Sequence, residues 1–244
     1  MSKKAIVGAA VLALPARLIL AGQVSYILVT QFHVGGNAND HHSIFAAYAE
    51  NQTWMAVHLG QFVSMAVLLS GLIVLAFALD YQSEAARWMG RVGAAGAVAT
   101  LALYGVLQAV DGVALKHAAN AWTSASEGER VSRFATAEAI RWLEWGMRSY
   151  QDYAMGLSLL LFAGSTAQSM IVARPVPQLI CLSGLAYLSQ GWLAGSEGFS
   201  TNQSIAIVLG WILSLTWMGW LAVIASRRSG RSHKTLEASS RNAA

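Results

Sequence analysis

Apolar residues occur along the chain in long blocks that are separated by polar connections. Each block is about twenty residues long, the length that an α-helix needs to cross a hydrocarbon core of about 30 Å. The alternating pattern of an outer-membrane barrel is absent from the sequence. The pattern therefore predicts an all-α, polytopic membrane protein with a six-helix transmembrane bundle. The predicted spans are about 10–32, 54–79, 92–116, 149–172, 177–197 and 204–225.

Two polar connections have helical periodicity of their own. The segment "NDHHSIFAAYAE" is expected to form a short helix, with Asn39 or Asp40 as its N-cap. Apolar and aromatic residues recur at helical spacing in residues 131–145, and the Trp content is typical of a helix that lies at a membrane interface. We therefore expect amphipathic helices on the extracytoplasmic face of the bundle.

The two ends of the chain have different expected roles. The basic start followed by a long apolar run predicts an uncleaved first span rather than a cleaved signal peptide. Arg17 interrupts this run, so either the span begins near it or its side chain reaches back to the headgroups. We expect a single transmembrane domain over residues 1–226 and a disordered cytoplasmic tail over residues 227–244.

The composition agrees with a membrane protein. Hydrophobic residues make up 55% of the chain and charged residues 11%, whereas a soluble domain carries about 25% charged residues. The net charge of +4 comes mainly from cations beside the apolar blocks and in the tail, which indicates topology rather than nucleic-acid binding. Cys181 is the only cysteine, which excludes an intramolecular disulfide and a cysteine-based metal site.

Lysine and arginine in the short connections indicate the orientation. In a six-span arrangement, the cations of the two ends and of the connections near residues 80–91 and 173–177 all fall on one side. Both termini are therefore expected in the cytoplasm. The four arginines of the long connection count against this orientation, although a long, structured loop weighs less in the rule. They are Arg130, Arg133, Arg141 and Arg148.

Polar side chains within the predicted spans follow a regular pattern. They recur three or four residues apart, a spacing that places them on one side of a helix. They also fall in the half of each span that is nearest the expected outer side, so we predict an inward-facing polar pocket that opens outward. The stripes are Gln23, Tyr26, Thr30 and His33; His58 and Gln61; Tyr104, Gln108 and Asp111; and Ser183, Tyr187, Gln190 and Glu197.

Asp111, Glu144 and His58 are the candidate catalytic residues. A charge at the bilayer centre costs about 2.5–3.5 kcal/mol, so intramembrane ionisable groups tend to mark functional sites. Asp111 is either a proton-carrying or ligand-binding carboxylate, or an interfacial charge that Lys116 or Arg148 neutralises. Lys116 itself is interpreted as an ordinary boundary residue. Gly112 would let another backbone or a ligand approach closely.

Further residues are candidates for binding a ligand. For the segment around residues 138–153, the alternative interpretation is an amphipathic helix face with an interfacial aromatic belt. The ligand-binding candidates are Gln61, Gln108, Tyr104, Glu138, Arg141, Arg148, Tyr187 and Gln190.

Five of the six histidines are predicted on the same side of the membrane. Imidazole and carboxylate groups suit Zn, Cu, Fe or Ni, and two axial imidazoles would suit a haem. No histidine spacing is diagnostic, and a single histidine among apolar residues, such as His58, is more often a hydrogen-bonded core residue than a ligand. The cofactor therefore stays open between a transition metal, a haem and none. The candidate metal ligands are His58, His41, His42, His117 and Asp111.

Residues 40–170 carry a pattern of a histidine near the end of one span, "AVDGVALKHAANAW" at the end of the next, and the Glu/Trp-rich "AEAIRWLEWGMRSYQDY". In this it resembles the DUF4386-like group of small bacterial multi-pass membrane proteins, a group with no established activity. The resemblance implies a location in the bacterial cytoplasmic membrane. It also supports His58, Asp111 and Glu144 as positions to test, without giving them a task.

Three functions remain open from the sequence. The first is an integral membrane protein whose outward-facing polar pocket binds a small ligand, a metal or a haem, with redox or enzymatic use. The second is a structural or assembly subunit, whose polar stripes would face another membrane protein or a second copy of the chain. The third is a proton-coupled transporter, which would need a polar path to the cytoplasmic side.

Overall fold

The computed structural model describes residues 11–241, with side chains through residue 227. Within these residues the chain folds only into helices, which confirms the predicted all-α class. The elements are α2 (Ala13–Thr30), α3 (His41–Glu50), α4 (Trp54–Ala78), α5 (Glu84–Gln108), the π-helix η1 (Ala109–Leu115), α6 (Lys116–Thr123), α7 (Arg130–Ala167), α8 (Pro175–Glu197) and α9 (Thr201–Arg241).

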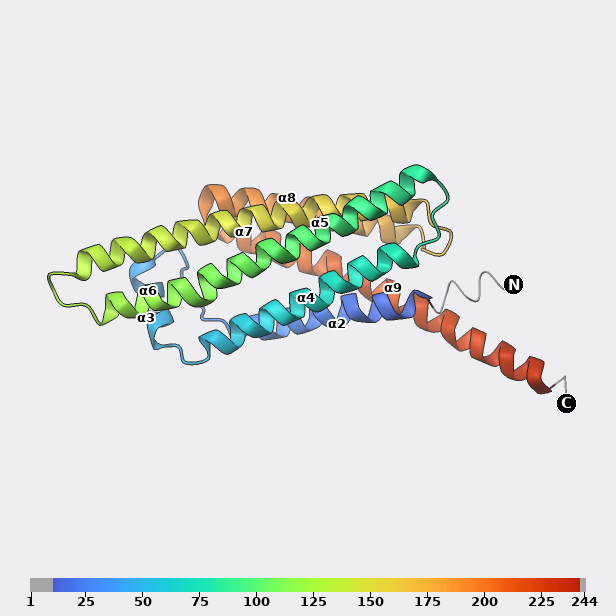
Figure 1. Cartoon of the computed structure of the whole chain (residues 1–244), viewed down its shortest axis with the longest axis horizontal. Helices are drawn as coiled ribbons and strands as arrows, with labels where there is room; N and C mark the ends of the chain where they lie inside the picture. The colour runs from blue at the N-terminus through green and yellow to red at the C-terminus, as the bar shows by residue number, and fades with distance from the viewer. Residues whose placement is uncertain (1–10, 242–244) are drawn as a thin grey trace.

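The long helices run alongside one another in an elongated bundle (Figure 1). Helices α3 and α6 lie at one end of the bundle, and α2 begins at the opposite end, where α9 leaves it (Figure 1). In the described part of the chain, four helices are long and apolar enough to cross a membrane: 13–30, 54–78, 84–123 and 201–227. The structure therefore supports a membrane protein. The predicted spans 149–172 and 177–197 correspond to α7 and α8, which are not among these four.

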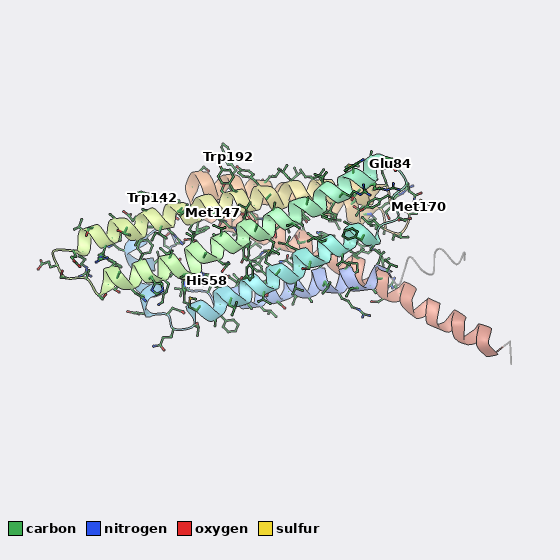
Figure 2. All side chains as sticks on the ribbon, viewed as in Figure 1. His58, Glu84, Trp142, Met147, Met170 and Trp192 are labelled. Atoms are coloured by element: carbon green, nitrogen blue, oxygen red, sulfur yellow. The ribbon has the colours of Figure 1, made fainter. Side chains whose placement is uncertain are left out.

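The surface of the bundle is largely apolar, as a lipid-facing surface must be. Large aliphatic and aromatic side chains are exposed along the long helices. Trp142 and Trp192 point away from the bundle (Figure 2), and both are more than half exposed. Trp145 is half-buried instead, with its ring against that of Phe199. The aromatic belt predicted around α7 thus has both outward-facing and inward-facing members.

Two helices are longer than the sequence pattern predicts. The expected amphipathic helix and the expected fourth span form one helix, α7, of 38 residues. At 1.5 Å per residue, α7 is about 57 Å long. No proline interrupts residues 130–167, so the helical hydrogen bonding continues from the amphipathic part into the apolar part. Likewise, the helix of the third predicted span continues past residue 116 to Thr123.

The ends of several elements test other predictions. Asp40 caps α3 as predicted, because its carboxylate accepts a hydrogen bond from the Ser43 N–H at 3.3 Å. Arg17 is exposed on α2. Helix α9 continues to Arg241, where the sequence predicted a disordered tail at 227–244. Residues 242–244 of that tail lie outside the described residues, as do residues 1–10 with the start of the first predicted span.

Glycines allow the helices of the bundle to pack closely. At the crossing of α7 and α8, a Cβ atom on Gly156 would lie 2.8 Å from the carbonyl oxygen of Gly184. Any larger residue would push the two backbones apart. This is the small-residue packing that membrane helices use, because dispersion contacts rather than water exclusion hold them together.

Two apolar clusters divide the interior. The larger fills most of the bundle, and the smaller lies at the end formed by α3, α6 and the beginnings of α4 and α7. The smaller cluster is built from Ile44, Phe45, Tyr48, Trp54, Leu115, Ala118, Ala119, Trp122 and Ala137. The candidate residues gather where the two clusters meet.

Candidate functional site

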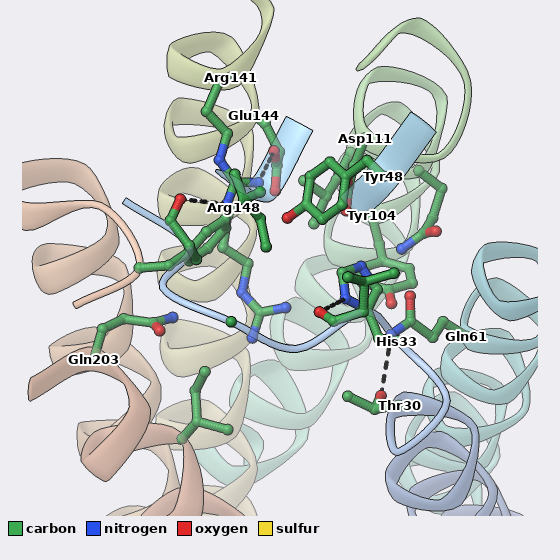
Figure 3. A pocket seen from close by; sticks show the side chains of 18 of the residues that line it. Thr30, His33, Tyr48, Gln61, Tyr104, Asp111, Arg141, Glu144, Arg148 and Gln203 are labelled. Carbon is green, nitrogen blue, oxygen red and sulfur yellow. Dashed lines mark hydrogen bonds and ion pairs between the residues drawn. The ribbon is translucent and has the colours of Figure 1, made fainter. Parts of the chain in front are cut away.

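A cavity of about 240 Å³ lies at the junction of the two apolar clusters (Figure 3). Its walls include Tyr26 and Tyr104 of the large cluster and Ile44 and Tyr48 of the small one. We call this space the junction cavity. Of the predicted site residues, the structure places seven on its wall: Gln61, Tyr104, Gln108, Asp111, Arg141, Glu144 and Arg148.

His58 and Asp111 are in direct contact beside this cavity. His58 Nε2 lies 3.0 Å from Asp111 Oδ2, and His58 Nδ1 lies 2.8 Å from the carbonyl oxygen of Trp54. The indole of Trp54 in turn donates to the carbonyl oxygen of Gly112 at 3.0 Å. The partner of Asp111 is therefore His58, rather than Lys116 or Arg148 as the interfacial-charge interpretation of the sequence had it.

The backbone around Asp111 is a π-helix of seven residues, continuous with α5 before it and α6 after it. In a π-helix each hydrogen bond spans one more residue than in an α-helix, and such segments are rare and often occur at functional sites. The neighbouring Gly112 is packed against His58: a Cβ atom there would lie 2.9 Å from His58 Cβ. The predicted close approach at Gly112 is thus made by the His58 side chain.

His33 joins this pair from the connection after α2. Its ring centroid lies 5.2 Å from that of His58, and its Nδ1 lies 3.1 Å from the carbonyl oxygen of Val34. One ligand atom each of His33, His58 and Asp111 lies within 4.8 Å of the others. The sequence placed His33 on a polar stripe and on the same side as the other histidines, but not among the candidate metal ligands.

The other predicted metal ligands lie elsewhere. His41 Nδ1 is 2.9 Å from a carboxylate oxygen of Glu138, and the His42 ring stacks on Phe134 at 4.1 Å between centroids. His117 is exposed on α6. In the described residues, the group that could hold a metal contains none of these three histidines.

Arg141 and Glu144 form a buried contact on α7, with Arg141 Nη1 donating to Glu144 Oε2 at 2.6 Å. Arg141 Nη2 also donates to the carbonyl oxygen of Ala38 at 3.0 Å. Burial raises the pKa of Glu144 to about 8, the negative charge of Asp111 adds to the rise, and Arg141 opposes it. Burial lowers the pKa of His33, which keeps its imidazole neutral.

Arg148 forms a second pair one helical turn further along α7. Its Nε donates to Asp152 Oδ2 at 2.9 Å, and its Nη1 lies 3.4 Å from the hydroxyl of Tyr26. The guanidinium of Arg148 points into the cavity, where Figure 3 shows it between α7 and the loop after α2.

Three predicted binding residues do not line the cavity. Glu138 is held by His41, and Tyr187 is buried in the large apolar cluster. Gln190 donates its side-chain amide to the carbonyl oxygen of Ala206 at 3.2 Å and so ties α8 to α9. The helical spacing of Gln190 indicated that its side chain faces the inside of the bundle. A side chain that faces inward can also make contacts between helices rather than line a cavity.

The sequence missed several residues of the cavity wall. Thr30, which the sequence gave only as a stripe residue, accepts a hydrogen bond from the Gln61 amide at 3.1 Å. Tyr48 comes from α3, and Gln203 comes from the first turn of α9. Gln203 lies outside the polar stripes, and only the fold brings the start of α9 beside α7 and the loop after α2.

That loop covers the junction cavity and is tied to the turn between α8 and α9. The Asn39 side chain donates to the carbonyl oxygen of Glu197 at 3.0 Å and accepts from the N–H of Phe199 at 3.2 Å. The ring of Phe199 packs against Arg141, 4.7 Å from the guanidinium carbon to the ring centroid. We call residues 33–40 the covering loop.

Lys116 has a defined structural task, contrary to its interpretation as an ordinary boundary residue. Its ammonium donates to the carbonyl oxygens of Tyr48, Ala49 and Asn51 at 2.6, 2.8 and 2.9 Å. These carbonyls lie at the C-terminal end of α3, where a cation also complements the helix dipole. Lys116 therefore fixes α3 to the π-helix side of the site.

Four side-chain atoms on the cavity wall are buried and have no hydrogen-bond partner in the described structure. They are Asp111 Oδ1, Gln108 Oε1, Arg141 Nε and Gln203 Nε2. Buried polar atoms in folded proteins are nearly always paired, because leaving one unpaired costs about 1–3 kcal/mol. Four residues of the cavity wall therefore carry hydrogen-bonding capacity that the protein itself does not satisfy.

Comparisons with protein-family models, with curated proteins and with solved structures found no match to this chain.

Proposed function

We propose that the chain is a six-span membrane protein that binds a small polar ligand in the junction cavity. The six-span arrangement adds α7 and α8 to the four strongly apolar helices, beside which they pack in the same bundle (Figure 1). An even number of crossings agrees with the start of α2 and the end of α9 lying at the same end (Figure 1).

The proposed location is the bacterial inner membrane with both termini in the cytoplasm, as the distribution of lysine and arginine predicts. The junction cavity then lies on the extracytoplasmic side, with α3, the covering loop and residues 141–148 of α7 on its wall. Helix α7, at about 57 Å, exceeds a hydrocarbon core of about 30 Å by enough to carry its first turns out of the lipid. A ligand would reach the cavity from water.

The observation that carries the ligand proposal is the set of four unpaired polar atoms around one cavity. Two are acceptors, on Asp111 and Gln108, and two are donors, on Arg141 and Gln203. Rings of Tyr26 and Trp211 complete the wall. These features favour a small molecule with both hydrogen-bond donors and acceptors and a short apolar part.

The interior supports binding more than transport or assembly. The buried side chains of the bundle half nearest the termini are mainly apolar, including Leu72 and Leu75 at 1% exposure, and the polar ones among them are serine and threonine rather than charged residues, so the charged layer does not continue through it. An assembly subunit would present its polar stripes on the outside. Gln61 and Gln23 are instead buried within the monomer.

Native mass spectrometry of the protein, extracted into nanodiscs without detergent, tests the proposal. We expect wild type to carry a small non-lipid molecule at one per chain. Gln203→Leu removes one donor and should weaken retention about tenfold, the equivalent of about 1.4 kcal/mol. The matched control is Gln178→Leu, which removes an exposed glutamine at the opposite end of the bundle and should change nothing.

Two results would contradict the proposal. One is wild-type protein that carries no such molecule. The other is equal retention by wild type, Gln203→Leu and Gln178→Leu, because the bound molecule would then lie outside the junction cavity.

A further inference from the structure

We propose that His33, His58 and Asp111 form a binding site for one divalent transition-metal ion in the wall of the junction cavity. The three residues come from three separate segments: the covering loop, α4 and the π-helix. Their ligand atoms converge to within 4.8 Å of one another. The inference does not rest on the proposed small-molecule ligand, and each can fail without the other.

In each imidazole, a hydrogen bond from Nδ1 to a backbone carbonyl leaves Nε2 available for the metal. A carbonyl oxygen can only accept, so Nδ1 of His58 donates to Trp54 and Nδ1 of His33 donates to Val34. This leaves Nε2 of each ring as the metal-binding atom. Metal-bound histidines almost always donate their other N–H to a carbonyl or carboxylate in this way.

The spacing of the ligand atoms suits a small ion. Atoms bound at about 2.1 Å to a tetrahedral centre lie about 3.4 Å apart. Nε2 of His58 and Oδ2 of Asp111 are 3.0 Å apart, so a metal between them needs a shift of a few tenths of an ångström and takes the place of the shared hydrogen. Oδ1 of Asp111, buried without a partner, is free to be the second carboxylate contact.

The donor set favours a bare transition-metal ion over a haem. Two imidazoles with one carboxylate are the donor types of Zn²⁺ hydrolase sites and of non-haem Fe²⁺ sites. A haem between His33 and His58 would need the space that Asp111 occupies, because Asp111 lies within 4.8 Å of both. Mg²⁺, which prefers oxygen ligands, is a poor match.

Three protein ligands leave at least one coordination position open. His33 and Asp111 both line the junction cavity, so we expect this position to be reached from the cavity. A water molecule or an electron-rich atom of a ligand would occupy it. The π-helix has a clear role here, since it carries Asp111 to the same side as His58 while Gly112 leaves room for the His58 ring.

The test uses full-length protein in nanodiscs, freed of any polyhistidine tag, stripped with a chelator and titrated with Zn²⁺. We expect one Zn²⁺ per chain, measured by mass spectrometry of the metal, and no binding of Mg²⁺ at the same concentration. His33→Ala and Asp111→Asn should each weaken Zn²⁺ binding at least tenfold. The matched control His117→Ala removes an exposed histidine at the same end of the molecule and should bind as wild type does.

Either of two outcomes overturns the metal site: wild type that binds no Zn²⁺, or His33→Ala that binds Zn²⁺ as tightly as wild type. His33 lies outside the helices, so its alanine variant keeps the test decisive even if Asp111→Asn fails to fold. Metal-loaded protein without a small molecule would contradict only the ligand proposal. Protein that retains a small molecule but binds no metal would contradict only the metal site.

Discussion

At the residue scale, the site combines three buried contacts between charged or titratable side chains within one layer of the molecule. His58 faces Asp111, Arg141 faces Glu144, and Arg148 faces Asp152. Replacing one partner of a buried pair leaves an uncompensated charge, which typically costs about 3–5 kcal/mol, whereas the intact pair adds little net stability. Such pairs are costly to keep for stability alone, which is consistent with a binding role.

Glu144 gives this layer a pH dependence. Its pKa of about 8 in the folded protein lies above the usual value of 4.5, owing to burial and to Asp111, with Arg141 and His58 acting in the opposite direction. The folded state therefore binds a proton that the unfolded state has released. The stability from this proton is complete below pH 4.5 and falls as the pH rises toward 8.

We therefore expect wild type to lose up to about 1.4 kcal/mol of stability per pH unit between pH 6.5 and pH 8. Glu144→Gln, which mimics the protonated form, should show a flatter profile over the same range in thermal unfolding. His33 acts in the opposite direction, but only below its usual pKa of 6.5. Parallel profiles for wild type and Glu144→Gln would show that Glu144 does not bind this proton.

At the element scale, the π-helix is the feature that places Asp111. It packs against α4 through Gly112, whose hydrogen faces His58 where any side chain would collide. A continuous α-helix through residues 109–115 would turn Asp111 to a different side of the α5–α6 rod, since each residue added to or removed from a helix rotates the later residues by about 100°. The contact with His58 thus depends on backbone geometry as well as on side-chain type.

Gly112→Ala tests this contact. Its Cβ would lie 2.9 Å from His58 Cβ and 3.0 Å from His58 Cγ, so we expect a loss of about 1–3 kcal/mol in thermal unfolding. The matched control is Gly146→Ala in α7, where a Cβ would meet nothing within 4 Å. That change should instead stabilise the protein by about 0.5–1 kcal/mol, the usual gain for alanine in a helix. Equal effects of the two substitutions would contradict the close packing.

At the scale of the whole molecule, a polar layer lies between two apolar clusters. The larger cluster fills most of the bundle, and the smaller cluster lies at the end formed by α3 and α6. If six helices cross the membrane, that end and the termini are on opposite sides of it (Figure 1).

Single-cysteine labelling in intact cells tests this arrangement. Cys181 is the only cysteine, so Cys181→Ser gives a background without thiols. We expect Thr30→Cys, on the cavity wall, to react with a membrane-impermeant maleimide, and Gln178→Cys, at the opposite end, to react only after the membrane is permeabilised. Ser165→Cys is the buried control and should not react in either case. Labelling of Gln178→Cys in intact cells would reverse the orientation or change the number of spans.

Much of the fold can be predicted from the hydrophobic pattern, because blocks of about twenty apolar residues have few other solutions. The pattern also found several residues of the cavity wall, since polar residues at helical spacing such as Gln61 and Gln108 must turn inward. The pattern did not predict that two expected helices join into α7. Their joining depends on the absence of a helix-breaking residue such as proline, not on periodicity.

The finer site could not be read from the sequence for a physical reason. Gln203 reaches the site from a helix end, where no repeat marks the orientation of a side chain. His33 continues the spacing of the first stripe, but it lies in the loop after α2, so the spacing does not fix its position. The π-helix leaves no residue-type signal in "LQAVDGVALKH", because it differs from an α-helix only in which carbonyl each N–H reaches. Lys116 likewise acts through backbone carbonyls, which every sequence possesses.

The covering loop has a consequence for rates. Two hydrogen bonds from the Asn39 side chain to the α8–α9 turn, together with the contact of Arg141 with Ala38, hold this loop across the junction cavity. If a molecule enters on this side, these bonds must open for it to pass, and the frequency of opening then sets an upper limit on both association and dissociation. In that case the side chain of Asn39 influences how long a bound molecule stays, whereas the residues of the cavity wall determine how tightly it binds.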